Sequence, residues 1–98
     1  MRNGKLRSMH CMELPFVFDH VNDIAFMTGD GADRQPLADR ISRAWVAFAR
    51  NGNPSHEGLP TWPAFNPSTR ATMVFDRECS VVNDPYGEER RAMAALRA

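Results

Sequence analysis

The chain has 98 residues, of which 43% are hydrophobic and 24% are charged, and a domain of this size buries roughly 60 to 65% of its unfolded surface. Twelve Lys and Arg residues balance twelve Asp and Glu residues, so no long-range positive field favours nucleic acid or an anionic membrane. No apolar run approaches the ~18 residues of a membrane-spanning helix. We therefore predict one small domain at most, with no nucleic-acid partner and no membrane partner.

The first predicted elements are a polar tail and a short helix. Residues 1–9 are polar and basic and contain Gly4, which indicates a loop or a tail. The following run from Leu14 to Phe18 is apolar, and a proline at its second position suits the first turn of a helix. We predict a short helix after His10, followed by a mostly irregular segment over residues 22–34.

A longer helix is predicted over residues 36–51. Pro36 suits its first turn, where the missing N–H is not needed, and Gly52 with Pro54 beyond it provides a stop signal. Its large apolar side chains share one face, because they recur three or four residues apart. We predict that this face is buried; it consists of Leu37, Ile41, Trp45 and Phe48.

The last part of the chain is predicted as a proline-rich loop, a hairpin and a helix. Four prolines between residues 53 and 70 exclude regular structure there. Two apolar or β-branched runs separated by a polar turn predict a hairpin over about residues 72–82. Asp84 followed by Pro85 is typical of a helix start, so we predict a C-terminal helix with Asp84 as its N-cap, running through Leu96.

Four segments occur in an order that resembles the end of a known family. The first contains a histidine, a glutamate three places later and an apolar run. The second is a helix with Trp and Phe three residues apart, closed by a Gly-x-Pro turn. The third is a Trp-Pro-x-aromatic loop, and the fourth is a late strand. The segments are Ser8–Phe18, Leu37–Pro54, Leu59–Phe65 and Arg70–Asp76. Together they resemble the type-B carboxylesterases, the α/β-hydrolase family that contains the bacterial para-nitrobenzyl esterases and the cholinesterases.

The resemblance implies an α/β fold of which this chain holds the C-terminal part. Residues 1–98 then form a partial carboxylesterase domain, and by themselves we expect them to adopt an α+β arrangement of the elements above. The implied substrate is a small-molecule carboxylic ester, no cofactor is implied, and the implied partner is the missing N-terminal part of the same fold. We weigh one alternative of a different class: a non-catalytic remnant or truncated product that self-associates as a small structural module.

His10 is the candidate catalytic residue. In serine esterases a histidine takes the proton of the serine hydroxyl and returns it to the leaving alcohol, and in α/β-hydrolases it follows the serine and the acid in the chain. None of the five serines lies in a Gly-x-Ser-x-Gly elbow, so we expect the chain alone to be inactive. Glu13 has two open roles: the resemblance implies a buried carboxylate that orients the site, and the simpler interpretation is a solvated or helix-capping charge.

The other histidines and the cysteines have simpler interpretations. His20 and His56 are predicted to be surface residues, since neither has a second ligand at metal spacing. We expect Cys11 and Cys79 to be free thiols, while the sequence leaves a bridge between them open. Cys11 lies beside His10, but neighbours in sequence usually point apart, so we do not predict a thiol and imidazole nucleophile.

Overall fold

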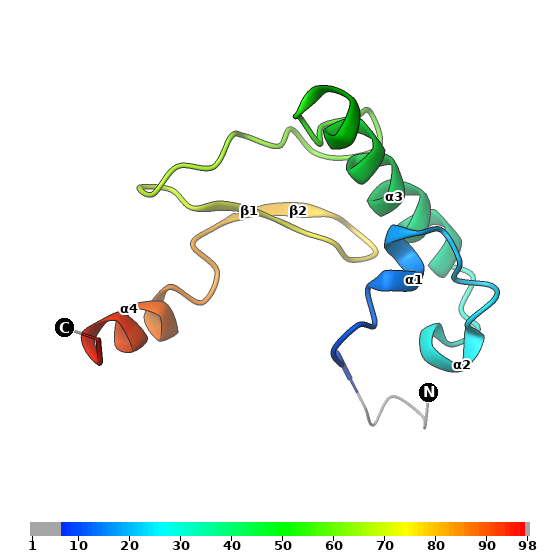
Figure 1. The fold of residues 1–98 in the computed structure, drawn as a ribbon, viewed down its shortest axis with the longest axis horizontal. Coiled ribbons are helices and arrows are strands. Elements are labelled where there is room, and N and C mark those ends of the chain that lie inside the picture. The colour runs from blue at the N-terminus through cyan, green and yellow to red at the C-terminus, as the bar shows by residue number, and fades with distance from the viewer. Residues whose placement is uncertain (1–6, 98) are drawn as a thin grey trace.

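The computed structural model describes residues 7–97, and Figure 1 shows their arrangement. Most of the predicted tail of residues 1–9 lies outside the described residues. The short helix after His10, the longer helix, the hairpin and the last helix that the sequence predicts are all found. The elements in chain order are α1 (Leu14–Val17), α2 (Ala25–Thr28), α3 (Arg34–Asn51), β1 (Ala71–Val74), β2 (Ser80–Asn83) and α4 (Gly87–Ala95).

Helix α3 is the longest element and organises the fold. It spans 18 residues and begins two residues before the predicted start. Gly52 ends it in the left-handed region with a φ of 74°, and its N–H donates a 2.8 Å hydrogen bond to the carbonyl of Phe48. Glycine adopts this conformation without the Cβ clash that other residues meet. The predicted stop therefore falls at the right residue.

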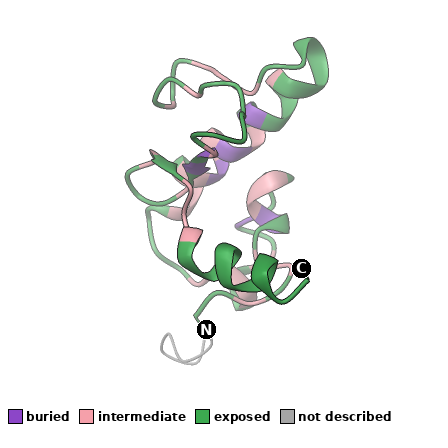
Figure 2. Cartoon of the chain, turned by 90° about the vertical axis from the view of Figure 1, so that its left-hand side faces the viewer, coloured by how far each residue is buried: buried purple, intermediate pink, exposed green. Residues whose placement is uncertain are grey.

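Helix α1 packs against α3 and buries a narrow stripe of it (Figure 1). The buried residues of α3 are spaced three apart, so they lie along one side of the helix. In Figure 2 this stripe is the buried stretch in the middle of the long helix. It consists of Ala38, Ile41 and Ala44.

The prediction that α3 buries its aromatic side chains is wrong. Trp45 is 57% exposed and Phe48 is 53% exposed, whereas Ile41 is buried and Leu37 is half-buried. Periodicity identifies the apolar side of a helix but not what covers it. Here α1 is a single turn of four residues, which is too short to cover the whole apolar face of α3.

The segment before α3 is held by the side chain of Arg34. Its guanidinium donates to the carbonyl of Val21 at 2.9 Å, to the hydroxyl of Thr28 at 3.2 Å and to the carbonyl of Gly31 at 3.0 Å. Val21 itself is fully buried. Apart from the single turn of α2, this segment is irregular as predicted, and polar contacts give it a defined path.

The strands β1 and β2 form the predicted hairpin. They pair antiparallel with Ala71 opposite Asn83 and Val74 opposite Ser80. Along β1, Ala71 and Met73 are buried while the residues between and after them are exposed. This alternation is expected for a strand with one covered face.

The tip of the hairpin is fastened to α3. The side chain of Arg77 forms an ion pair of 2.6 Å with Asp33, the residue that precedes α3. The guanidinium of Arg40 donates a 3.0 Å hydrogen bond to the carbonyl of Arg77. These contacts set the position of the hairpin relative to α3.

The proline-rich loop between α3 and β1 is anchored by Trp62. The ring of Trp62 meets the ring of Phe75 edge to face, with 5.8 Å between their centroids. Trp62 is half-buried. The loop therefore returns along the hairpin despite its lack of regular structure.

Helix α4 is confirmed, but the prediction that Asp84 caps it is wrong. The cap position is taken by Tyr86, and no side chain caps the helix. Asp84 instead has a left-handed backbone with a φ of 46° and binds Arg90 on the first turns of the helix. Pro85 and Tyr86 occupy the turn between them, so the helix begins later than the sequence suggests.

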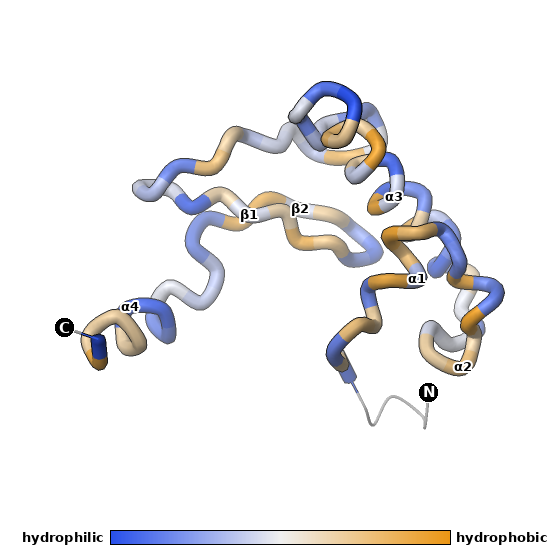
Figure 3. Tube along the Cα trace, viewed as in Figure 1, coloured by the Kyte–Doolittle hydropathy of each residue, from blue (hydrophilic) through white to orange (hydrophobic). Residues whose placement is uncertain are grey.

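The whole arrangement is open. Its radius of gyration is 15.6 Å, against about 13 Å for a compact domain of this length. The chain exposes 7553 Å², about a third more than the ~5,700 Å² expected for a compact protein of 11.1 kDa. Helix α4 lies at the opposite end of the molecule from α1 and α2 (Figure 1). Figure 3 shows that apolar stretches are distributed over these separated parts of the chain. The described residues therefore lack a single shared core.

Candidate active site

His10 lies on a tight turn immediately before α1. The N–H of Met12 donates to the carbonyl of Met9 at 3.3 Å, and the N–H of Leu14 donates to the carbonyl of Cys11 at 3.3 Å. His10 is the second residue of the first turn and is exposed, whereas the other three residues of that turn are half-buried. Cys11, the third residue, has a positive φ of 65°, as a type II turn requires at that position.

The turn lies between two open apolar cavities. Met9 and Met12 line a cavity of about 460 Å³ between the turn, α1 and α3. Cys11 lines another, of about 660 Å³, on the side of α2. His10 lines neither of them. The apolar residues thus anchor the turn on two sides and leave the imidazole in solvent.

Glu13 follows the turn at the start of α1. Its carbonyl accepts the N–H groups of Phe16 at 2.9 Å and Val17 at 3.0 Å, but its side chain makes no capping hydrogen bond. Glu13 is exposed and lines the first cavity. The simpler interpretation allowed a helix cap or a solvated charge. The missing hydrogen bond excludes the cap, and the exposure of Glu13 agrees with a solvated charge. No hydrogen bond links Glu13 to His10 among the described residues.

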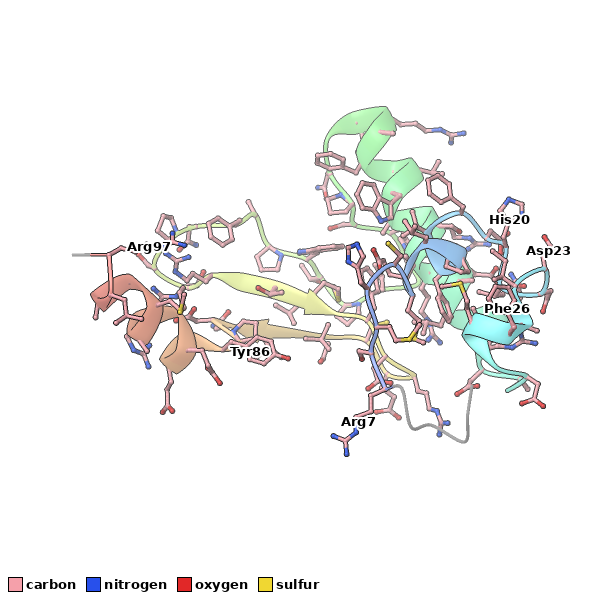
Figure 4. The ribbon with its side chains drawn as sticks, turned by 60° about the horizontal axis from the view of Figure 1, so that its bottom comes forward. Arg7, His20, Asp23, Phe26, Tyr86 and Arg97 are labelled. Atoms are coloured by element: carbon pink, nitrogen blue, oxygen red, sulfur yellow. The ribbon has the colours of Figure 1, made fainter. Side chains whose placement is uncertain are left out.

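The two other histidines differ from each other. His20 is exposed, as predicted, and its Nδ1 lies 2.9 Å from the carboxylate of Asp23; Figure 4 shows both side chains at the edge of the molecule near α2. Asp23 is exposed as well. This pair therefore belongs to the surface and not to the turn that carries His10.

The prediction that His56 is a surface residue is wrong, because it is half-buried. Its Nδ1 accepts the N–H of Gly58 at 3.1 Å, so its Nε2 carries the proton and donates to the carbonyl of Arg40 at 2.9 Å. His56 thereby ties the loop after α3 back to the middle of that helix. The contact joins residues 16 apart, a distance that no local sequence pattern reveals.

Both cysteines are free and half-buried, in agreement with the favoured interpretation. The thiol of Cys79 lies 3.5 Å from the carbonyl of Asp76. His20 lines the same cavity as Cys11, but within residues 7–97 no hydrogen bond joins an imidazole to either thiol. No assembled thiol nucleophile is found in the described part of the chain.

The same residues show neither a metal site nor a membrane span. Among residues 7–97, no cluster of three His, Cys, Asp or Glu side chains could hold a metal ion. No helix in that range has the length and apolarity needed to cross a membrane.

Comparison with known proteins decides the family. A family model described as the carboxylesterase family matches residues 2–93. The chain belongs to this carboxylesterase family. The resemblance of the four segments in the sequence is thereby confirmed.

Curated relatives of this carboxylesterase segment are much longer. The para-nitrobenzyl esterase of Bacillus subtilis (strain 168) is 37% identical over 89 residues, which cover 89% of this chain and 18% of the relative. The phenmedipham hydrolase of Pseudarthrobacter oxydans is 35% identical over 85 residues, covering 80% of this chain and 17% of the relative. The chain thus spans less than a fifth of the length of these relatives.

Solved structures of carboxylesterases share the conformation of this segment. The Geobacillus stearothermophilus carboxylesterase EST55 at pH 6.2 superposes with a TM-score of 0.76 and 37% identity, covering 89% of this chain and 19% of that one. A PNB esterase structure gives a TM-score of 0.75 and 38% identity over 84% of this chain and 17% of that one. These neighbours have the α/β-hydrolase fold, with which the helices and the hairpin described above are compatible.

Proposed function

We propose that residues 1–98 form the C-terminal part of a type-B carboxylesterase domain and that His10 is its general base. One observation carries the proposal: His10 is the exposed residue of an anchored turn in a chain of the carboxylesterase family. His20 and His56 both have hydrogen-bonding partners, while His10 has none among the described residues. Its imidazole is therefore available to another group.

In the complete enzyme, His10 would accept a proton as a serine oxygen attacks the carbonyl carbon of the ester. The new bond to carbon forms while the serine O–H bond breaks, and the proton moves to an imidazole nitrogen. When the tetrahedral intermediate collapses, the same proton goes to the departing alcohol oxygen. A second cycle with water releases the acid and regenerates the serine. No cofactor takes part in this scheme.

The serine, the acid and the oxyanion donors would be supplied by the missing N-terminal part of the fold. The chain has no Gly-x-Ser-x-Gly elbow, and in α/β-hydrolases the histidine comes last in chain order. The exposed rings of Trp45 and Phe48 offer an apolar surface on which such a part can pack. Burial of a large apolar side chain contributes about 1.5 to 3 kcal/mol.

The substrate class that we propose is a small carboxylic ester. The named relatives act on chemically different compounds, as the names para-nitrobenzyl esterase and phenmedipham hydrolase indicate. Glu13 is proposed as a carboxylate that becomes buried beside the site and orients it, because it lines the cavity next to the turn. The acyl and alcohol pockets would be formed by the missing part.

The test is complementation. The chain is co-expressed with the N-terminal part of a carboxylesterase that contains the serine elbow, and hydrolysis of p-nitrophenyl acetate is measured. His10→Ala should lower kcat by roughly 10⁴-fold or more, as loss of a triad base does in other hydrolases. His20→Ala should leave the rate within a few-fold, since His20 lies apart from the turn. Full activity of the His10→Ala complex would contradict the proposal.

The alternative is a non-catalytic module that self-associates. The observation that favours it is the same exposed apolar surface, since a second copy could cover Trp45 and Phe48. Sedimentation velocity of the isolated chain distinguishes oligomers from monomers. If the chain forms a stable oligomer that does not dissociate to bind the serine-bearing part, the structural role is favoured.

A further inference from the structure

The backbone at Cys11 departs from what its residue type prefers. Its φ is 65°, in the left-handed region that non-glycine residues seldom enter. Such conformations persist where the surrounding structure enforces them, and they concentrate at functional sites. Here the constrained residue directly follows His10.

The turn around Cys11 is closed by its neighbours. The hydrogen bond from Met12 N–H to Met9 carbonyl closes the turn across His10 and Cys11. Met9 and Met12 both line the cavity against α3, whereas Cys11 lines the cavity on the side of α2. A positive φ at the third position lets the turn close with its first and last residues on one side.

The geometry points to Cys11 as a positioning residue whose left-handed backbone directs the imidazole of His10 out of both cavities. This inference rests on the proposed role of His10 and adds a residue that acts through it. Cys11 acts by its backbone and not by its thiol. The conformation of the turn then depends mainly on whether the residue at position 11 tolerates a positive φ, and little on the size of its side chain.

Two substitutions separate this role from simple filling of the cavity. Glycine tolerates positive φ freely, so Cys11→Gly should keep the turn although it removes the side chain. Valine is β-branched and avoids positive φ, so Cys11→Val should change the turn although it fills the cavity. If Cys11 only fills space, the order is reversed: valine is tolerated and glycine is not.

The chain provides a matched control for the valine substitution. Cys79 is also a free, half-buried cysteine, but it is not among the residues with positive φ. Cys79→Val therefore reports the general effect of replacing a half-buried thiol by valine. It should leave the His10 turn unchanged.

The first readout is NMR of the 98-residue chain. Backbone and ring resonances of His10 should shift in Cys11→Val and stay close to wild type in Cys11→Gly and Cys79→Val. Amide resonances of α3 and of the hairpin show whether each variant is folded. If Cys11→Val does not fold, Cys11→Ala replaces it: alanine should shift the His10 resonances further from wild type than glycine does.

The second readout is hydrolysis of p-nitrophenyl acetate by the complemented enzyme. Cys11→Val should lower kcat by roughly 10- to 100-fold with little change in KM, because misplacing a catalytic group by about 1 Å can cost ~10²-fold. Cys11→Gly should remain within a few-fold of wild type. Unchanged His10 resonances and unchanged kcat in Cys11→Val, or the reversed order of Gly and Val, would overturn the inference.

The two proposals can fail separately. If His10→Ala keeps full activity, His10 is not the base and the proposed function fails, whereas the NMR order of the Gly and Val variants still decides the role of Cys11 in the turn. If His10→Ala is inactive and Cys11→Val is fully active with unshifted His10 resonances, the base assignment stands and the positioning role fails.

Discussion

Arg90 and Asp84 form a two-point contact that ties α4 to the end of the hairpin. The Nε of Arg90 donates to one carboxylate oxygen at 2.9 Å and Nη2 donates to the other at 2.8 Å. The hydrogen bonds from this guanidinium are the main reason why the pKa of Asp84 lies below its usual value. The positive charges of Arg90 and of two nearby arginines also lower this pKa, whereas desolvation of the carboxylate raises it. The contact therefore depends on pH.

We predict that α4 loosens in acid. Because the folded-state pKa of Asp84 is lowered, the stabilisation is complete above the unfolded-state value of about 3.9 and is lost as the pH falls through the folded-state pKa. The protection factors of the α4 amides, which correct for the intrinsic slowing of exchange in acid, should fall over that range. Asp84→Asn should show low protection in α4 at every pH, while Asp30→Asn, at an exposed loop position, should behave as wild type.

The second prediction concerns the exposed aromatic face of α3. Ile41→Ala should lower the free energy of unfolding by about 2 to 5 kcal/mol, since Ile41 is buried. Trp45→Ala in the isolated chain should lower it by about 1 kcal/mol or less, because surface substitutions have small effects. Urea denaturation measures both. A loss of ~3 kcal/mol or more for Trp45→Ala, as expected of a core aromatic, would show that the isolated chain covers this ring.

His56 should contribute to stability without contributing to catalysis. Removal of its two hydrogen bonds in His56→Ala should lower the free energy of unfolding by about 1 to 3 kcal/mol. His20→Ala is the matched control and should stay within about 0.5 kcal/mol, since its contact is exposed. Equal stability losses in the two variants would contradict the structural role of His56.

We expect the isolated chain to be catalytically silent. Without a serine elbow or oxyanion donors, it should hydrolyse p-nitrophenyl acetate no faster than an equal concentration of imidazole. A rate that saturates with substrate concentration and disappears in His10→Ala would show that the chain contains a complete site by itself.

Local sequence patterns were sufficient to predict the order and type of the main elements. Gly52 stops α3 because glycine alone tolerates the left-handed region without strain, and that preference is visible in the sequence. The β-branched and apolar run around Met73 predicts the strand, because such residues favour an extended backbone. The four segments in order, of which the motif around His10 is the first, also indicate the right family.

Tertiary context explains what sequence patterns missed. Trp45 is exposed because coverage of a helix face depends on other parts of a fold. The role of His56 depends on a carbonyl of α3 that only the folded chain brings near. Cysteine has no known preference for positive φ, so nothing in the sequence marks Cys11 as the constrained residue of the turn. Asp84 has the residue type of a cap but binds an arginine instead.

The hairpin has a consequence for production of the protein. Within the described residues, β1 and β2 pair only with each other, so each strand has an edge with unpaired N–H and C=O groups. Val74 and Val82 are exposed. Charged residues and prolines usually block edge-to-edge pairing of strands, and neither strand contains one. When chains are made without a covering partner, a fraction of them should therefore pair edge to edge and be lost as β-rich aggregates, while the remainder stays in solution. The soluble yield in a cell then depends on two competing rates: that at which the strand edge pairs with its proper neighbour and that at which it pairs with another copy.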